Sequence, residues 1–140
     1  MASKPRVLVL DSWSIIAYLE DEPAGVKVAD LMAEAHESGI PLKMTVVNVG
    51  EVWYILARGT SESEADRSIA ELLELGIEFV EVDWKLAHSA ARFKANHKMS
   101  FADGFAAALA LQDRGAALVT GDKEFKQVED QVKIMWLNVE

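Results

Sequence analysis

The apolar positions of the chain alternate between short continuous runs and longer stretches with helical spacing. The first run, Val7–Leu10, has the length and composition of a buried strand. Apolar residues then recur at helical spacing from Ile15 to Leu19, and this helix ends before Pro23. A buried strand therefore leads into a helix at Asp11, directly after a run of aliphatic residues.

The same alternation of strand and helix patterns continues along the chain. Ser61 and Glu64 have the spacing of a capping box at the start of one helix, and Gly76 ends that helix. The pattern predicts further strands at residues 40–46, 77–82, 116–120 and 132–137, and further helices at residues 24–37, 47–58, 62–75, 84–97, 101–114 and 123–128. Strands that alternate with helices over short connections predict a three-layer α/β/α sandwich with a mainly parallel central sheet. The length fits a single domain over residues 1–140.

Composition narrows the class of protein. About half of the residues are apolar, yet no stretch approaches the roughly 18 consecutive apolar residues of a membrane-spanning helix. The apolar run after Arg6 is too short for the core of a signal peptide, so we expect a cytoplasmic protein. The absence of cysteine excludes disulfides, zinc–thiolate sites and a cysteine nucleophile.

The net charge of −9 argues against the broad basic surface that drives most nucleic-acid binding. A phosphate-containing substrate would need either a local basic strip or bound divalent cations. The best candidate for such a strip is Arg92–Lys98, followed by Lys123 and Lys126. The ordinary alternative for these residues is a solvated helix face.

Two acids follow predicted strands directly. Asp11 follows one buried strand, and Asp122 follows Ala116–Thr120 after a single glycine. Parallel strands end at the same edge of a sheet, and ligands bind there where the strand order reverses. We therefore expect both carboxylates at one edge.

Two further acids belong to helix starts. Asp103 lies in the first turn after Ser100 and shares a helical face with alanines that allow close approach to the sheet. Glu51 lies near the start of the helix that follows the second strand, with Ile55 one turn beyond it. The first position places a carboxylate at the end of a buried face, and the second places one at a strand-to-helix junction.

Each acid also has an ordinary explanation, as a helix N-cap, a first-turn acid or surface charge. Together, however, several carboxylates at one sheet edge would repel one another unless protons or cations neutralised them. Without cysteine, and without a pair of histidines at ligand spacing, oxygen ligands favour Mg²⁺ or Mn²⁺ over zinc. Phosphodiester hydrolysis is the natural chemistry of such a site.

Four segments carry these acids in order across nearly the whole chain: VLDSWSIIAYL, TVVNVGEVWYIL, SFADGFAAALA and LVTGDKEF. They resemble the PIN-domain family, especially the VapC-like toxin ribonucleases. The resemblance implies a metal-dependent endoribonuclease that uses Mg²⁺ or Mn²⁺, cleaves RNA, forms a homodimer and is blocked by a small antitoxin protein encoded beside it.

The resemblance also implies roles for particular residues. Asp11 would be the central metal ligand, Glu51 and Asp103 would complete the acidic cluster, and Asp122 would hold a metal or its bound water. Thr120 would orient a ligand or a water, and Ser12 would do the same. One departure from the family is Gly104, where alanine is more common; this glycine would loosen its helix by about 1 kcal/mol.

Other functions stay open at this level. The chain could be a PIN-like nuclease or phosphohydrolase outside a toxin–antitoxin system, an inactive scaffold, or a receiver-like Mg²⁺-binding signalling domain. The receiver alternative needs an acid pair after the first strand, whereas Ser12 follows Asp11. The remaining aromatic and imidazole residues favour core, dimer-interface or ordinary helix positions: Trp13, Trp53, Trp84, Trp136, His36, His88 and His97. Of these, Trp13 and Trp53 adjoin the proposed site segments.

Overall fold

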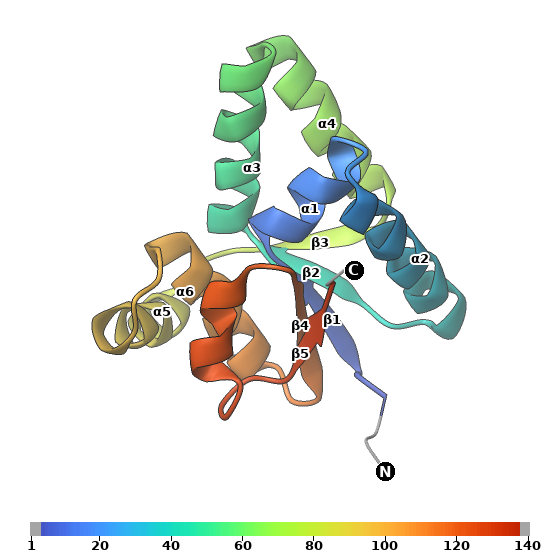
Figure 1. Ribbon diagram of the computed structural model, residues 1–140. Coiled ribbons are helices and arrows are strands. Elements are labelled where there is room, and N and C mark those ends of the chain that lie inside the picture. The colour runs from blue at the N-terminus through green and yellow to red at the C-terminus, as the bar shows by residue number, and fades with distance from the viewer. Residues whose placement is uncertain (1–3, 138–140) are drawn as a thin grey trace.

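A five-stranded, wholly parallel sheet forms the centre of the protein, with the strand order β3-β2-β1-β4-β5 (Figure 1). The computed structural model describes residues 4–137. The strands are β1 (Val7–Leu10), β2 (Leu42–Thr45), β3 (Ile77–Val80), β4 (Ala116–Thr120) and β5 (Ile134–Trp136). The order reverses between β1 and β4, because the chain first builds the sheet on one side of β1 and then on the other.

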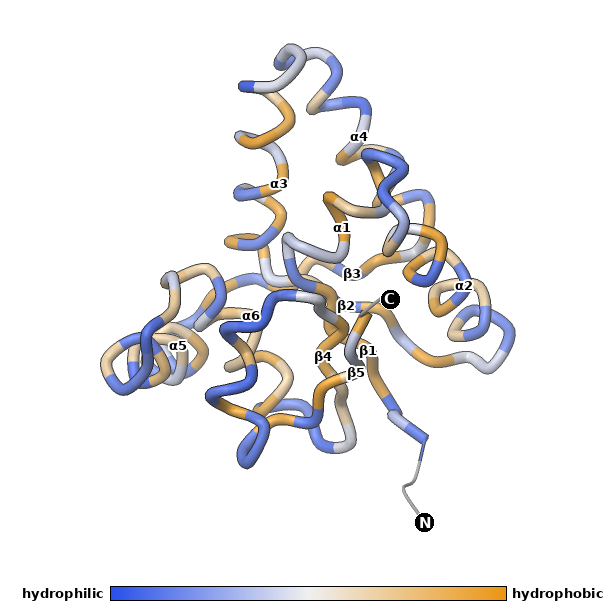
Figure 2. The backbone as a smooth tube through the Cα atoms, viewed as in Figure 1, coloured by the Kyte–Doolittle hydropathy of each residue, from blue (hydrophilic) through white to orange (hydrophobic). Residues whose placement is uncertain are grey.

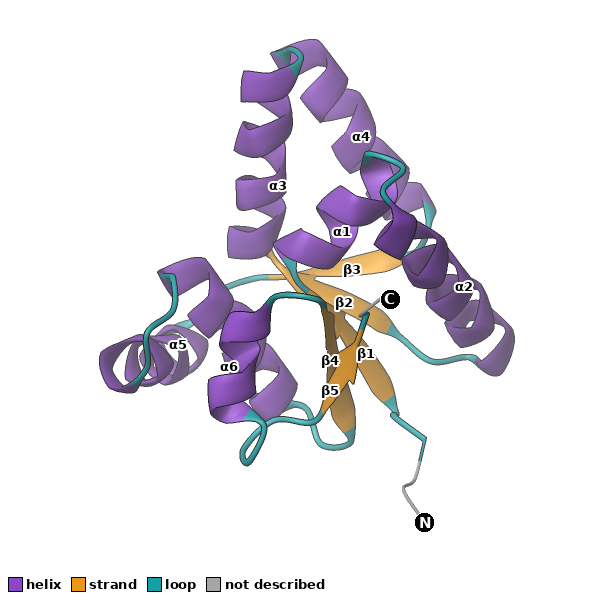
Figure 3. Cartoon of the chain, in the orientation of Figure 1, coloured by secondary structure: helices purple, strands orange, loops and turns teal. Residues whose placement is uncertain are grey.

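Helices cover both faces of this sheet. They are α1 (Ser12–Leu19), α2 (Pro23–Ser38), α3 (Val46–Gly59), α4 (Glu62–Glu74), α5 (Trp84–Asn96), α6 (Phe101–Gln112) and the 3₁₀ helix η1 (Lys123–Val128). Helices α1 to α4 pack on one face and α5 and α6 on the other (Figure 3). The predicted three-layer α/β/α sandwich with a parallel sheet is confirmed. None of the helices between residues 4 and 137 is both long and apolar enough to cross a lipid bilayer.

The core is split in two by the sheet. One cluster joins Leu10 and Met44 to the apolar faces of α1 to α4, and the other joins Val9 and Leu118 to α5 and α6. Successive side chains of a strand point to opposite faces, so Val9 and Leu10 serve different clusters. The strands in the middle of the molecule are accordingly hydrophobic, while hydrophilic stretches lie on the outer helices (Figure 2).

Each predicted strand and helix is present, but some strands are shorter than expected. The strand expected at 40–46 is Leu42–Thr45, and Val46 is the first residue of α3 instead of the last of the strand. The reason is local: the Thr45 side chain accepts a hydrogen bond from the Asn48 backbone N–H at 3.1 Å and so caps the helix. An N-cap residue of this kind starts a helix that apolar periodicity alone cannot delimit.

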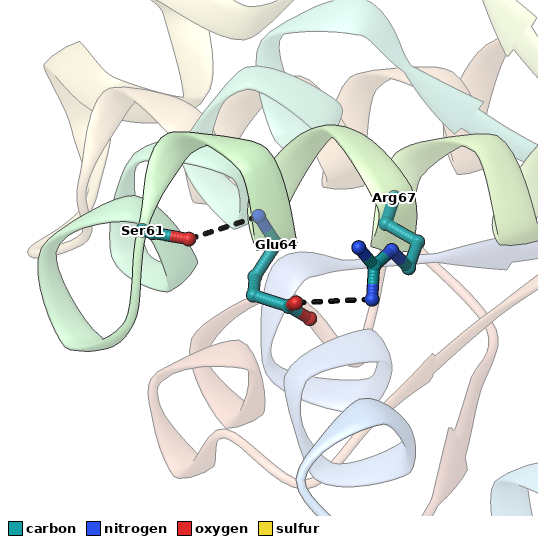
Figure 4. A network of polar contacts seen from close by, with 3 residues as sticks. All are labelled: Ser61, Glu64 and Arg67. Carbon is teal, nitrogen blue, oxygen red and sulfur yellow. Dashed lines mark hydrogen bonds and ion pairs between the residues drawn. The ribbon is translucent and has the colours of Figure 1, made fainter.

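The predicted capping box at the start of α4 is half formed (Figure 4). The Ser61 hydroxyl accepts from the Glu64 backbone N–H at 3.1 Å. The Glu64 carboxylate pairs with Arg67 at 3.1 Å, one turn along the helix. Both side chains of this ion pair are largely exposed, so it contributes little to the free energy of unfolding.

Gly104 has a packing role that the sequence did not reveal. It is buried in α6 where that helix meets α5, and a Cβ at this position would lie 2.8 Å from the backbone oxygen of Ala90. The expectation that this glycine merely loosens its helix is incomplete. The missing side chain lets α6 approach the backbone of α5 closely.

Substitution of Gly104 by alanine should therefore destabilise the protein. Helix propensity alone favours alanine by about 1 kcal/mol, but a clash with backbone atoms costs about 1–3 kcal/mol because the neighbouring helix must shift. We expect Gly104→Ala to lower the free energy of unfolding by about 1 kcal/mol, measured by urea denaturation.

Gly50 in α3 provides the matched control. A Cβ there would meet no atom within 4 Å, so Gly50→Ala should raise the free energy of unfolding by about 0.5–1 kcal/mol. If the two substitutions stabilised the protein equally, the close packing of α6 on α5 would be refuted.

Candidate active site

The carboxyl ends of β1 and β4 form the base of the candidate site. These strands are neighbours on either side of the reversal in strand order, with Leu10 paired to Val119 in the register. Asp11 follows β1 directly, and Asp122 follows β4 after Gly121. The structure thus brings both acids to one sheet edge, as the sequence predicted. This edge is the usual place for a ligand in an open parallel sheet.

Asp11 is buried, with only 1% of its surface exposed. One carboxylate oxygen caps α1 by accepting from the Ser14 backbone N–H at 2.8 Å, and the other accepts from the Thr120 hydroxyl. Burial raises the pKa of Asp11 from 3.8 to about 6, although these two hydrogen bonds oppose the shift. The negative charge of Asp122 raises the pKa further. Neutral donors therefore orient this carboxylate without cancelling its charge.

Thr120 links the two strand-end acids. Its hydroxyl donates to Asp11 Oδ2 and accepts from the Asp122 backbone N–H at 3.0 Å. Asp122 Oδ1 in turn accepts from the Glu124 backbone N–H at 3.0 Å and caps η1. Because Thr120 and Asp11 are both buried, the hydrogen bond between them is shielded from water and fixes the geometry of the edge.

Asp103 approaches from α6. The Ser100 hydroxyl caps that helix by accepting from the Asp103 backbone N–H at 3.0 Å, which leaves the carboxylate in the first turn. Burial raises the pKa of Asp103 from 3.8 to about 7. The negative charges of the three other predicted acids add to the shift, in the order Asp122, Asp11, Glu51. The three other predicted carboxylates therefore all lie within electrostatic reach of Asp103.

Glu51 approaches from α3 and is held by Ser12. The Ser12 hydroxyl donates to Glu51 Oε1 and also lies 3.4 Å from the backbone oxygen of Asn48. The first turns of α1 and α3 lie side by side at this edge (Figure 1). The contact places Ser12 beside Glu51, and the orienting role that the resemblance implies for Ser12 stays a prediction.

Asn48 is a structural residue that the sequence reasoning missed. Its amide Nδ2 donates to the backbone oxygen of Ala102 at 3.0 Å, and its Oδ1 accepts from the Thr45 hydroxyl at 2.6 Å. It thereby ties the start of α3 to the start of α6, next to Asp103. The signal available in the sequence was a single asparagine between valines, VVNV, a position that the structure shows to be fully buried.

The acids open into a pocket of about 390 Å³. Its lining comprises Ser12, Trp13, Ile16, Glu22, Glu51, Ile55, Ser100, Asp103 and Asp122. Glu22, from the loop between α1 and α2, is an additional carboxylate that no strand-end pattern could identify. Asp11 is not part of the lining; it is buried and acts on the pocket through its charge and its hydrogen-bond partners.

The donor chemistry of this pocket fits a hard divalent cation. Carboxylate and hydroxyl oxygens are the ligands of Mg²⁺ and Mn²⁺, and no cationic side chain is among the groups that shift the pKa values of Asp11 and Asp103. Among residues 4–137, no three carboxylate or imidazole side chains form a ready-made group around one ion. A cation such as Mg²⁺, which keeps several water ligands and needs only one or two carboxylates, matches this open arrangement.

The predicted basic strip is directed elsewhere. Arg92, Asn96 and His97 line a separate pocket of about 520 Å³ together with Lys85 and His88. This second pocket contains no acidic lining residue. A role for the strip in RNA binding stays a prediction.

Two tryptophans differ from the core positions expected for them. Trp13 is 38% exposed and Trp84 is 75% exposed. Trp84 stacks on His88 with ring centroids 5.4 Å apart. Their part in a dimer interface stays a prediction.

The raised pKa of Asp103 leads to a prediction about stability and pH. An unfolded aspartate has a pKa near 3.9, so between about pH 4 and 7 the folded protein holds a proton that the unfolded chain releases. The free energy of unfolding should fall as the pH rises through this window, and the loss should be complete above about pH 7. Asp11 contributes in the same direction.

The substitution Asp103→Asn should remove part of the fall in the free energy of unfolding that occurs as the pH rises. In EDTA at pH 8 we expect the variant to be more stable than the wild type by about 1 kcal/mol, since solvent screens the exposed part of the carboxylate. At pH 4 the two proteins should be equally stable. Urea denaturation at both pH values measures the difference, with exposed Asp30→Asn as control. An identical pH dependence of Asp103→Asn and wild type would contradict the electrostatic description of the site.

Solved structures with folds similar to this one include two VapBC structures and a VapC toxin. VapBC from Salmonella typhimurium bound to DNA has a TM-score of 0.72 at 14% identity, over 94% of this chain and 98% of that one. VapBC2 from Rickettsia felis bound to a promoter DNA fragment has a TM-score of 0.70 at 13% identity, over 92% and 97%. VapC20 from Mycobacterium tuberculosis, described as a toxin that cleaves the sarcin–ricin loop, has a TM-score of 0.69 at 19% identity, over 86% and 94%.

Comparisons of sequence and topology identify the family. A search of curated protein sequences gave no match to this chain.

The receiver-like alternative is wrong, because that fold has the strand order 2-1-3-4-5 whereas this sheet has the order 3-2-1-4-5. The sequence profile of the PIN domain matches residues 8–131, nearly the whole chain. The chain therefore belongs to the PIN-domain family.

Proposed function

We propose that this protein is a metal-dependent endoribonuclease of the VapC type. The observation that carries the proposal is the gathering of Asp11, Glu51, Asp103 and Asp122 at the switch point of the sheet, where burial and the charges of the other three acids raise the pKa of Asp103 to about 7. The PIN-domain match and the structural similarity to a toxin that cleaves the sarcin–ricin loop support it.

In this proposal the acids hold Mg²⁺ or Mn²⁺. When bound, the cation neutralises the scissile phosphate and supplies an activated water. Glu51, Asp103 and Asp122 from the pocket wall, and Asp11 from the buried base, would hold it either directly or through its water ligands. The protein side contributes orientation: Thr120 fixes the carboxylate of Asp11, and Ser12 fixes that of Glu51.

Cleavage of single-stranded RNA tests the proposal directly. Purified protein should cleave it with added Mg²⁺ or Mn²⁺ and lose activity in EDTA. Asp11→Asn and Asp103→Asn should each lower kcat by roughly 100-fold or more, because each removes a charge that the cation requires. Asp30→Asn, an acid on the exposed face of α2, should cleave like the wild type.

A matched pair at Thr120 sharpens the test. Thr120→Val removes the hydroxyl that holds Asp11 and should cost about 10- to 100-fold in activity or metal affinity, the usual cost of losing a partner of a metal ligand. Thr120→Ser keeps the hydroxyl and should retain most of the activity. Full activity of the wild type in EDTA, or of Asp103→Asn in Mg²⁺, would overturn the proposed mechanism.

The proposal extends to a protein partner. Two of the similar structures named above are VapBC structures, so we propose that a small antitoxin binds this chain, and that the chain forms a homodimer. The gene beside this one should encode a short protein with a DNA-binding N-terminus.

Co-expression measures this partnership. The two proteins should elute together in size-exclusion chromatography, and the complex should cleave RNA at least about 10-fold more slowly than the free chain, since a blocked site cannot bind substrate. A neighbouring protein that neither binds nor inhibits would place the chain outside toxin–antitoxin systems while leaving the nuclease proposal intact.

A further inference from the structure

An exposed indole ring lies inside the acidic pocket. Trp13 is in the first turn of α1, two residues after Asp11, and is 38% exposed. It lines the same pocket as Glu51, Asp103 and Asp122. An indole is not a ligand for Mg²⁺ or Mn²⁺, so the proposed metal site does not explain its position.

The ring is held against the turn that follows β4. A Cβ at Gly121 would lie only 2.3 Å from Cη2 and 2.4 Å from Cζ3 of Trp13, distances that real Cβ atoms do not adopt. The benzo edge therefore packs directly on the backbone between Thr120 and Asp122. Through this contact the ring is positioned relative to both strand-end acids.

Trp13 differs from two other tryptophans in the hydrogen bonding of its indole N–H group. The indole N–H groups of Trp53 and Trp136 donate to Asp66 and Glu129, at 2.8 and 2.9 Å. The indole of Trp13 makes no hydrogen bond within residues 4–137. Packing on Gly121 fixes the ring, while its exposed part is available to a ligand.

Two aliphatic side chains extend this apolar surface. Ile16 lies one turn beyond Trp13 on α1, and Ile55 lies one turn beyond Glu51 on α3. Both line the pocket, and Ile55 is 36% exposed. The pocket therefore combines an acidic part with an aromatic and aliphatic wall. A nucleotide has the same two parts, a phosphate that binds through cations and a base with an apolar π-face.

We propose that Trp13, with Ile16 and Ile55, forms a nucleobase-stacking subsite for a nucleotide beside the scissile phosphate. The proposal rests on the proposed nuclease function and adds a binding site to it. Stacking on an aromatic ring is tolerant of base identity, because every base presents a π-face. The subsite thus positions the substrate by base contact in a pocket that has no cationic lining residue.

Three substitutions at Trp13 separate stacking from simple space filling. Trp13→Ala and Trp13→Leu remove the aromatic ring, and Trp13→Phe keeps one. In cleavage of single-stranded RNA with Mg²⁺, we expect KM to rise roughly 5- to 150-fold in the first two variants, the usual effect of losing one stacked base. Trp13→Phe should stay within about 3-fold of the wild type. Trp84→Ala, which removes an exposed ring on α5, should leave KM unchanged.

A modified substrate identifies the base. Removal of single bases from the RNA, one position at a time, should weaken binding to the wild type at one position beside the cleavage point. In Trp13→Ala the same abasic RNA should bind no worse than intact RNA, because the two changes remove the same interaction. Equal sensitivity of wild type and Trp13→Ala to every abasic position would overturn the subsite, as would an unchanged KM in Trp13→Leu.

A measurement of RNA binding in the absence of cleavage tests the stacking subsite separately from the proposed nuclease function. Fluorescence anisotropy of labelled single-stranded RNA in Mg²⁺, in an Asp103→Asn background, measures affinity in the absence of reaction. Loss of affinity in Trp13→Ala and its recovery in Trp13→Phe would support the subsite even if the wild type failed to cleave RNA. Cleavage together with Trp13-independent affinity would refute the subsite and leave the nuclease proposal standing. Circular dichroism confirms that each variant is folded.

Discussion

The site depends on one constraint, the electrostatic repulsion between its carboxylates. Neutral groups hold these carboxylates close together. The hydroxyl of Thr120 and the backbone N–H of Ser14 orient Asp11 but carry no net charge to compensate it. Burial, and after it the charges of the neighbouring carboxylates, raise the pKa values of Asp11 and Asp103 to about 6 and about 7. Such an arrangement lowers the stability of the fold and is typical of functional sites. A proton or a cation among the acids relieves it.

The topology of the sheet creates this crowding. Because β1 and β4 are neighbours at the reversal of strand order, the residues that follow them emerge side by side. Helices α3 and α6 bring two more acids to the same edge, and the amide of Asn48 ties their starts together through the backbone of Ala102. The missing side chain of Gly104 allows the close contact of α6 with α5. Segments far apart in the chain thus converge through packing on one sheet.

Capping and function are served by the same side chains. Asp11 caps α1 and Asp122 caps η1, as the ordinary interpretation of each residue predicted. The same carboxylates also contribute to the shared negative field at the pocket. The two interpretations are therefore compatible: a cap places a carboxylate at a helix start, and the sheet decides which helix starts meet.

The sequence by itself determined the order of the elements, the alternation of strand and helix, and the placement of four acids at strand ends and helix starts. These features follow from local periodicity and capping, which act over a few residues. Only the tertiary structure decided the strand order, the entry of Glu22 and Trp13 into the acidic pocket, the link from Asn48 to Ala102 and the close approach at Gly104. Each of these depends on contacts between distant segments, and no local pattern records which segments a folded chain brings together.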